Sequence, residues 1–155
     1  MLVSHRIDHD SKVIITTFAP EEVTLELFLE TFNKYQEELK YLPDFQKYNE
    51  LVDFRSITSI NISASELKKL SNIASKKDTQ GTVTKLALLV DSKPAFTLAK
   101  VYEFIRNLNP ISKKQVKVFQ EFEPALDWVT ESGEKISQIL LIFFVKSKFN
   151  FNFCV

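Results

Sequence analysis

The residues best suited to catalysis are few in this sequence and lie far apart along it. Its two histidines, His5 and His9, fall near the start of the chain, and its single cysteine, Cys154, is the next-to-last residue. A Ser-His-Asp or Cys-His site needs a histidine inside the domain, where it can meet the nucleophile. The sequence therefore argues against such a catalytic site, and we expect a protein that is not an enzyme.

Metal and phosphate sites are disfavoured as well. His5 and His9 are four positions apart in a predicted strand, which separates them by roughly 13 Å at about 3.3 Å per residue, too far to share an ion. The chain has two glycines in 155 residues, whereas P-loops and dinucleotide-binding turns need closely spaced glycines. We therefore expect neither a metal nor a cofactor.

Asp53 and Arg55 form the best-placed charged pair, at the end of a largely apolar run over residues 50–55. The run predicts a buried strand, and open α/β sheets tend to bind ligands at the carboxyl ends of their strands. Side chains two positions apart on a strand share a face. The pair is therefore predicted to form an ion pair, with contact to a bound molecule at this rim as the alternative.

Ser63 and Glu66 have the spacing of a capping box. In this motif the serine hydroxyl accepts a hydrogen bond from the backbone N–H of Glu66, whose carboxylate reaches back to the N–H of Ser63. A helix is therefore predicted to begin near Ala64. Its apolar positions, including Leu67 and Leu70, fall on one face, as in a helix packed on a core.

A longer amphipathic helix is predicted over residues 24–42, where apolar residues recur at spacings of three and four. Pro20 is predicted to lie just before the helix or in its first turn, where proline is common, and Pro43 should end the helix. Its apolar face is rich in aromatic residues. Such a stripe usually forms core, but it can also line a pocket for an apolar ligand; the residues concerned are Phe28, Phe32 and Tyr35.

Strands and helices alternate along the rest of the chain. Residues 5–18 predict an antiparallel hairpin, and the uninterrupted apolar run 86–90 predicts a strand covered on both faces. A strand at residues 116–119 and a helix from Glu123 follow. Because alternating strands and helices form parallel crossovers, we predict a single α/β domain whose mixed central sheet has about five strands, with helices on its faces.

Another helix is predicted to open near Pro94 and to end before Asn109 and Pro110. Apolar residues recur along it at helical spacing and should form its buried side. These residues are Leu98, Val101, Tyr102, Ile105 and Leu108.

Length and composition narrow the class of protein further. A chain of 155 residues that is 45% hydrophobic suits one compact domain. The charges of its 20 basic and 20 acidic residues cancel, so the chain has no net positive charge to attract nucleic acid. A single cysteine fits a reducing compartment, and the amino terminus does not have the pattern of a signal peptide. We expect a cytoplasmic protein that does not bind nucleic acid.

The order of predicted elements resembles the SpoIIAA-like group, a branch of the STAS and Sec14-like fold. Three local patterns carry the resemblance, at residues 51–58, 96–102 and 118–129. It implies a cytoplasmic bacterial domain without catalytic activity that regulates or binds a partner protein. The alternative that it implies is a binder of a small apolar ligand or lipid in a Sec14-like pocket, to which the three aromatic residues of the long helix would contribute.

The resemblance gives Ser63 a second interpretation. STAS domains that antagonise anti-sigma factors carry an Asp-Ser-Ser-Gly motif whose serine is phosphorylated at a helix start, and residues 61–64 occupy that place here. The motif has changed to Asn61, Ile62 and Ala64 around Ser63. A helix amino terminus favours negative charge, so a phosphate is physically tolerable there. Ser63 is thus a candidate phosphorylation position as well as a helix cap.

The resemblance to the SpoIIAA-like group does not extend to the end of the chain. We therefore divide the sequence into a domain at residues 1–133 and an apolar extension at residues 134–155. Residues 139–145 are all apolar but fall short of the roughly 20 that a membrane-spanning helix needs. Phenylalanines then alternate with asparagines over 149–153. Since an exposed patch of this kind is unusual in soluble proteins, we expect it to be covered by the domain or by a second copy in a homodimer.

Overall fold

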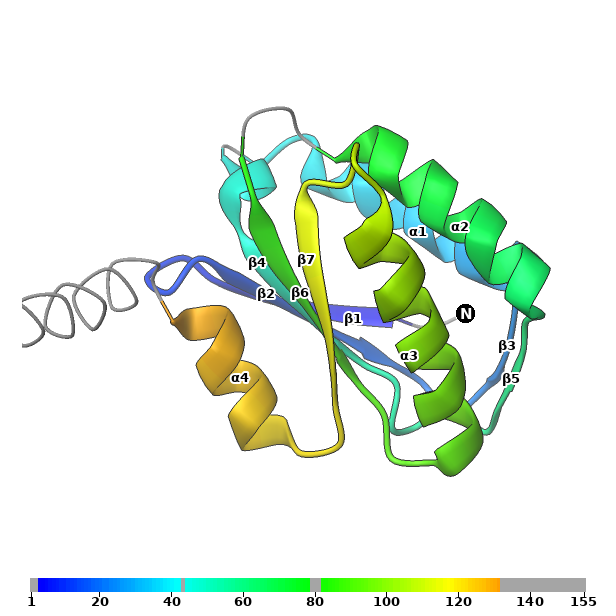
Figure 1. Cartoon of the computed structure of the whole chain (residues 1–155). Helices are drawn as coiled ribbons and strands as arrows, with labels where there is room; N and C mark the ends of the chain where they lie inside the picture. Colours follow the sequence, from blue (N-terminus) through cyan, green and yellow to red (C-terminus); the bar gives the residue numbers. More distant parts are fainter. Residues whose placement is uncertain (1–2, 43, 79–81, 132–155) are drawn as a thin grey trace, which may run out of the picture.

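The computed structural model describes residues 3–42, 44–78 and 82–131 (Figure 1). Five strands form the main sheet in the order β1-β2-β4-β6-β7. Strand β1 pairs antiparallel with β2, and the other neighbours are parallel. The predicted hairpin and mixed sheet are therefore confirmed. The strands are β1 (Val3–Asp8), β2 (Val13–Phe18), β4 (Asn49–Asp53), β6 (Thr84–Leu89) and β7 (Lys114–Phe119).

Helices cover both faces of this sheet. Figure 1 shows α1 (Leu25–Leu39), α2 (Ala64–Lys77) and α3 (Lys93–Leu108) on one side and α4 (Phe122–Thr130) on the other. Successive side chains of a strand point to opposite faces. Accordingly, Leu86 and Leu88 of β6 pack with α3, whereas Ala87 and Leu89 pack with α4. The predicted burial of residues 86–90 on both faces is confirmed.

A second, two-stranded sheet was not predicted from the sequence. Its strands, β3 (Glu22–Thr24) and β5 (Ser59–Asn61), are parallel and immediately precede the turns into α1 and α2. Val23 is 1% exposed and pairs with Ile60. This pairing takes the residues after Pro20 into a strand, so the prediction that Pro20 lies at the start of α1 is wrong.

The boundaries of α1 are set by caps rather than by the prolines. Thr24 caps its amino end, its hydroxyl accepting a hydrogen bond from the N–H of Leu27 at 3.3 Å. The helix ends at Leu39, before the predicted residue 42, and a short 3₁₀ turn, η1 (Phe45–Lys47), follows. The single helix predicted over residues 24–42 is thus present but shorter at both ends.

The carboxyl end of α3 also departs from prediction. Arg106 is 1% exposed, whereas Leu108, predicted to be buried, is 66% exposed. Side chains two positions apart on a helix point roughly 200° away from each other. Because Arg106 occupies the buried face, Leu108 is turned to solvent.

The apolar extension at residues 134–155 lies outside the described residues, as does Gly133. In the described ranges, no helix has the length and apolar character needed to cross a lipid bilayer.

Candidate functional site

A cavity of about 160 Å³ lies between the sheet and helices α1, α2 and α3. Its floor includes Thr16 and Phe18 of β2, Val52 of β4 and Leu88 of β6. Its walls are mostly apolar. The helical wall includes Phe28, Phe32, Tyr35, Leu70, Ala99 and Tyr102.

Three phenylalanines gather near the carboxyl ends of β2 and β4. The ring centroid of Phe18 lies 4.6 Å from that of Phe54 and 6.4 Å from that of Phe28, with the rings close to parallel. Phe28 and Phe54 are 6.3 Å apart. All three line the cavity. This part of the cavity is therefore an aromatic surface suited to a flat apolar group.

Charged side chains lie at the opposite, amino-terminal ends of the parallel strands. Lys114 at the start of β7 forms an ion pair with Glu50 of β4, and its Nζ lies 3.4 Å from the hydroxyl of Thr84. Glu50 and Lys114 both line the cavity. We call the region formed by Glu50, Lys114, Arg106 and Asp78 the polar end of the cavity.

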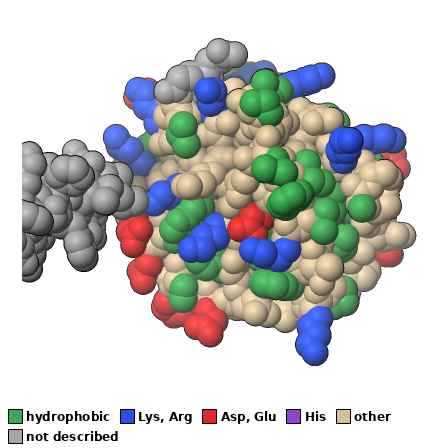
Figure 2. All heavy atoms as spheres, in the orientation of Figure 1, with side chains coloured by type: hydrophobic (Ala, Val, Ile, Leu, Met, Phe, Trp, Pro, Cys, Tyr) green, Lys and Arg blue, Asp and Glu red, His purple; other side chains and the backbone are tan. Residues whose placement is uncertain are grey.

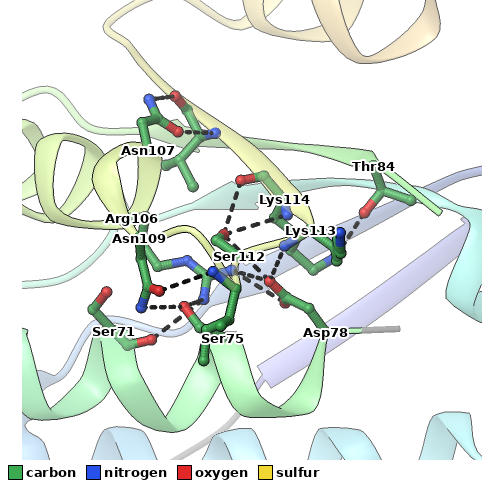
Figure 3. Close-up of polar contacts among 12 residues, drawn as sticks. Ser71, Ser75, Asp78, Thr84, Arg106, Asn107, Asn109, Ser112, Lys113 and Lys114 are labelled. Atoms are coloured by element: carbon green, nitrogen blue, oxygen red, sulfur yellow. Dashed lines mark hydrogen bonds and ion pairs between the residues drawn. The ribbon is translucent and has the colours of Figure 1, made fainter. Parts of the chain in front are cut away.

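Arg106 and Asp78 form a buried ion pair (Figure 3). The Nη2 atom of Arg106 donates to both carboxylate oxygens of Asp78 at 3.1 Å, and Nη1 donates to the Ser75 hydroxyl at 2.7 Å. Asp78 also accepts a hydrogen bond from the backbone N–H of Lys113 at 2.7 Å. The pair thus joins the ends of α2 and α3 to the start of β7, and both side chains line the cavity.

Two buried polar atoms of cavity-lining residues find no hydrogen-bond partner in the described part of the chain. They are the hydroxyl oxygen of Tyr35 and Nε of Arg106, each of which exposes less than 1 Å² and so faces packed side chains rather than the open space of the cavity. Burial raises the pKa of the Tyr35 hydroxyl well above its ordinary value, and the Glu50 carboxylate acts in the same direction through its charge and through a hydrogen-bond interaction that falls outside strict hydrogen-bond geometry. Burial also raises the pKa of Tyr102 to about 12. Both phenols are therefore protonated at neutral pH.

The structure brings the three predicted aromatic residues together at the cavity and places the other candidates elsewhere. Asp53 and Arg55 do form an ion pair, with Arg55 Nη2 2.8 Å from Asp53 Oδ2. Ser63 is exposed at the amino end of α2 and makes both halves of the predicted capping box. None of these three residues lines the cavity.

Sequence reasoning missed the polar end of the cavity. Asp78 is not among the residues that the sequence singles out, yet its side chain is 3% exposed. Arg106 carried a usable signal, since it follows Tyr102 by four positions on the buried stripe of α3. A charged residue within an apolar stripe is almost never buried without a partner, so its presence pointed to a buried ion pair.

Groups of three or more His, Cys, Asp or Glu side chains with the arrangement of a metal site are absent from the described residues.

No protein-family model matches this chain, and no curated protein matches it in sequence. A solved structure does match, that of an uncharacterised protein of the DUF3478 family from Shewanella loihica PV-4, described as having a SpoIIAA-like fold. The match has a TM-score of 0.52 and 15% sequence identity, and covers 82% of this chain and 93% of the other. This chain therefore has the SpoIIAA-like fold that its sequence resemblance predicts.

Proposed function

We propose that this chain is a non-catalytic binding module that holds a small apolar molecule between its sheet and helices α1, α2 and α3. The cavity carries the proposal. Its volume of about 160 Å³ accommodates roughly ten water-sized groups, since one such group needs about 10–15 Å³ on this measure. A molecule with a similar number of non-hydrogen atoms fits that space.

The unequal packing of the two faces of the sheet supports a binding role. The opposite face of the sheet is filled by side chains such as Ala125 and Val129, which are 0% exposed. Close packing is therefore achieved on one face, and the open space lies where Phe28, Phe32 and Tyr35 meet the sheet.

Native mass spectrometry of freshly purified full-length protein tests for a ligand retained from the cell. Thermal unfolding with isopropylbenzene (cumene) tests the cavity directly. We expect cumene to raise the melting temperature of the wild type, because a ligand that binds the folded state stabilises it. Ala99→Leu should remove this effect by filling the cavity, whereas Ala64→Leu, at an exposed position of α2 that does not line it, should preserve the effect.

The proposal is wrong if mass spectrometry shows no adduct and no apolar compound raises the melting temperature. It is also wrong if Ala99→Leu responds to cumene as the wild type does, because binding would then lie outside the cavity.

The second candidate function is a regulatory module that binds a partner protein. The observation that favours it is a group of exposed apolar residues at the end of α3 and just after it. Phe104, Leu108 and Ile111 are 65%, 66% and 52% exposed, and Figure 2 shows hydrophobic side chains gathered over α3. Exposed apolar groups of this kind often mark interaction sites.

Site-specific photo-crosslinking in the native cell tests this second function. A photoreactive phenylalanine at position 104 should yield one product of discrete mass, whereas the same group at Tyr41, which is 79% exposed, should not. Equal patterns from the two positions would argue against a partner at α3.

A further inference from the structure

The charged side chains that line the cavity do not balance one another. Three are positive and two are negative: Lys77, Arg106 and Lys114, and Glu50 and Asp78. Arg106 pairs with Asp78 and Lys114 pairs with Glu50, so these four charges cancel. Within the residues that the structure describes, Lys77 forms no ion pair, and its Nζ donates to the neutral amide oxygen of Asn33 at 2.8 Å. His5 also lines the cavity, but it is neutral at neutral pH because burial lowers its pKa. The described lining therefore carries one positive charge in excess.

Lys77 lies where a bound molecule can reach it. It is the last residue of α2 and is exposed, so the cavity meets solvent beside it. An ammonium group has three N–H donors, of which the contact with Asn33 uses one. The other two can bind an anion, which keeps part of its hydration at this exposed position. Such an anion therefore avoids the full cost of burying a charge.

Gln36 of α1 offers a second donor beside Lys77. The Nζ atom of Lys77 lies 5.0 Å from the ring centroid of Phe32. Gln36 follows Phe32 by four positions, and residues at this spacing are neighbours on a helix surface. Gln36 is half-buried and lines the cavity, and its side-chain amide makes no hydrogen bond in the described ranges. Helices α1 and α2 thus place an ammonium group and an amide group on the same side of the cavity.

The apolar remainder of the lining is suited to a hydrocarbon chain. Next to Lys77 on α2, it continues with Ala74, Leu70 and Leu67. We infer that the ligand is an amphiphile with one anionic head group of the carboxylate type, bound by Lys77 and Gln36, and with an apolar chain inside the cavity. A carboxylate with about eight carbons has about ten non-hydrogen atoms, which suits the volume of about 160 Å³. This inference rests on the proposed function.

Three probes with the same alkyl chain and different head groups test the inference. Octanoate is anionic, 1-octanol is neutral and octylammonium is cationic at neutral pH. Each is titrated into the isotope-labelled full-length protein, below the concentration at which it forms micelles, and binding is followed by NMR. The wild type is compared with Lys77→Gln, which removes the charge, and with Lys77→Arg, which keeps it. The matched control is Lys76→Gln, because Lys76 is also an exposed lysine of α2 but does not line the cavity.

Octanoate should bind the wild type at least about threefold more tightly than octylammonium does, because the excess charge of the lining is positive. Lys77→Gln should weaken octanoate binding about three- to tenfold, the range for loss of one partly exposed charge-assisted hydrogen bond, and leave 1-octanol within about twofold. Lys77→Arg and Lys76→Gln should both bind octanoate within about twofold of the wild type. As a second readout, the side-chain amide signals of Gln36 should shift more with octanoate than with 1-octanol.

The outcomes separate this inference from the function on which it rests. If 1-octanol binds in the cavity but Lys77→Gln binds octanoate as tightly as the wild type does, the inference is overturned and the cavity remains a binding site. The inference is also overturned if Lys76→Gln weakens octanoate binding as much as Lys77→Gln, or if octylammonium binds as tightly as octanoate. If no probe shifts the signals of cavity residues, the proposed function fails together with the inference.

Discussion

Ser63 carries a local structural role that the structure defines fully. Its hydroxyl accepts from the N–H of Glu66 at 3.3 Å, and its own N–H donates to the Glu66 carboxylate at 2.7 Å. The Ser63 hydroxyl also donates to the Glu66 carboxylate at 2.7 Å. This hydrogen bond and the one from the Ser63 N–H lower the pKa of Glu66. Its use as a phosphorylation position stays a prediction, whereas its use as a helix cap is confirmed.

Replacing Ser63 by alanine should lower the free energy of unfolding by about 1 kcal/mol, because the N-cap acceptor is lost. Urea unfolding followed by circular dichroism measures the change. Ser63→Thr, which keeps a hydroxyl that can both accept from the N–H of Glu66 and donate to its carboxylate, should stay close to the wild type. A loss of the same size in both variants would show that the hydroxyl acts in some other way.

His5 should make the stability of the domain depend on pH. Burial lowers the pKa of His5 below its ordinary value of 6.5, although Glu38 and Glu50 act in the opposite direction. The unfolded chain therefore binds a proton at a higher pH than the folded one. The contribution of His5 to the free energy of unfolding is complete above pH 6.5, and it is lost as the pH falls towards the lowered pKa of the folded state.

We expect the wild type to lose more stability than His5→Gln when the pH is lowered from about 7 to about 5. Urea unfolding at a series of pH values measures the difference between the two proteins, so that the shared carboxylates cancel. Parallel pH profiles for the two proteins would contradict the prediction.

Helices α2 and α3 are held together at their carboxyl ends by the Arg106–Asp78 pair. The pair links elements on one face of the sheet to each other and to β7. A buried charge that loses its partner is strongly destabilising, whereas an exposed ion pair contributes little. The contact between these helices therefore depends on Asp78, the residue at the carboxyl-terminal cap of α2.

Asp78→Asn should destabilise the protein by about 3–5 kcal/mol, because it leaves Arg106 buried without its counter-charge. The matched control is Asp44→Asn, which removes an exposed pair with Lys47 at 2.9 Å and should cost less than about 1 kcal/mol. Urea unfolding measures both. Similar losses in the two variants would mean that the buried pair is not what joins the helices.

At the scale of the whole molecule, the extension at residues 134–155 is the part whose role is still a prediction. Its apolar residues should be covered either by the domain or by a second copy of the chain. The two cases differ in the mass of the assembly.

Deletion of residues 136–155, followed by light scattering, distinguishes these cases. A dimer that depends on the extension should become a monomer, whereas an extension packed on its own domain should leave the mass unchanged and lower the stability. A truncated protein that is unchanged in both mass and stability, together with immediate proteolytic loss of the extension from the full chain, would contradict the prediction.

The sequence by itself determined the features whose causes are local. The capping box at Ser63 needs residues three positions apart, and the hairpin of β1 and β2 needs a short polar turn between two strands. The apolar run at 86–90 indicated burial on both faces because no polar residue interrupts it. Together these patterns were enough to predict the class of fold, whereas the aromatic stripe at Phe28, Phe32 and Tyr35 indicated either core or the wall of a pocket.

The tertiary structure alone decided the features that depend on distant parts of the chain. Strand β3 forms because Val23 pairs with Ile60 of β5. Leu108 is exposed because the ion pair with Asp78 holds Arg106 on the buried face of α3. The polar end of the cavity joins Glu50 to Lys114 across 64 positions of sequence. Helical and strand periodicity report which face of an element is apolar, but they do not report which elements meet or whether side chains fill the space between them.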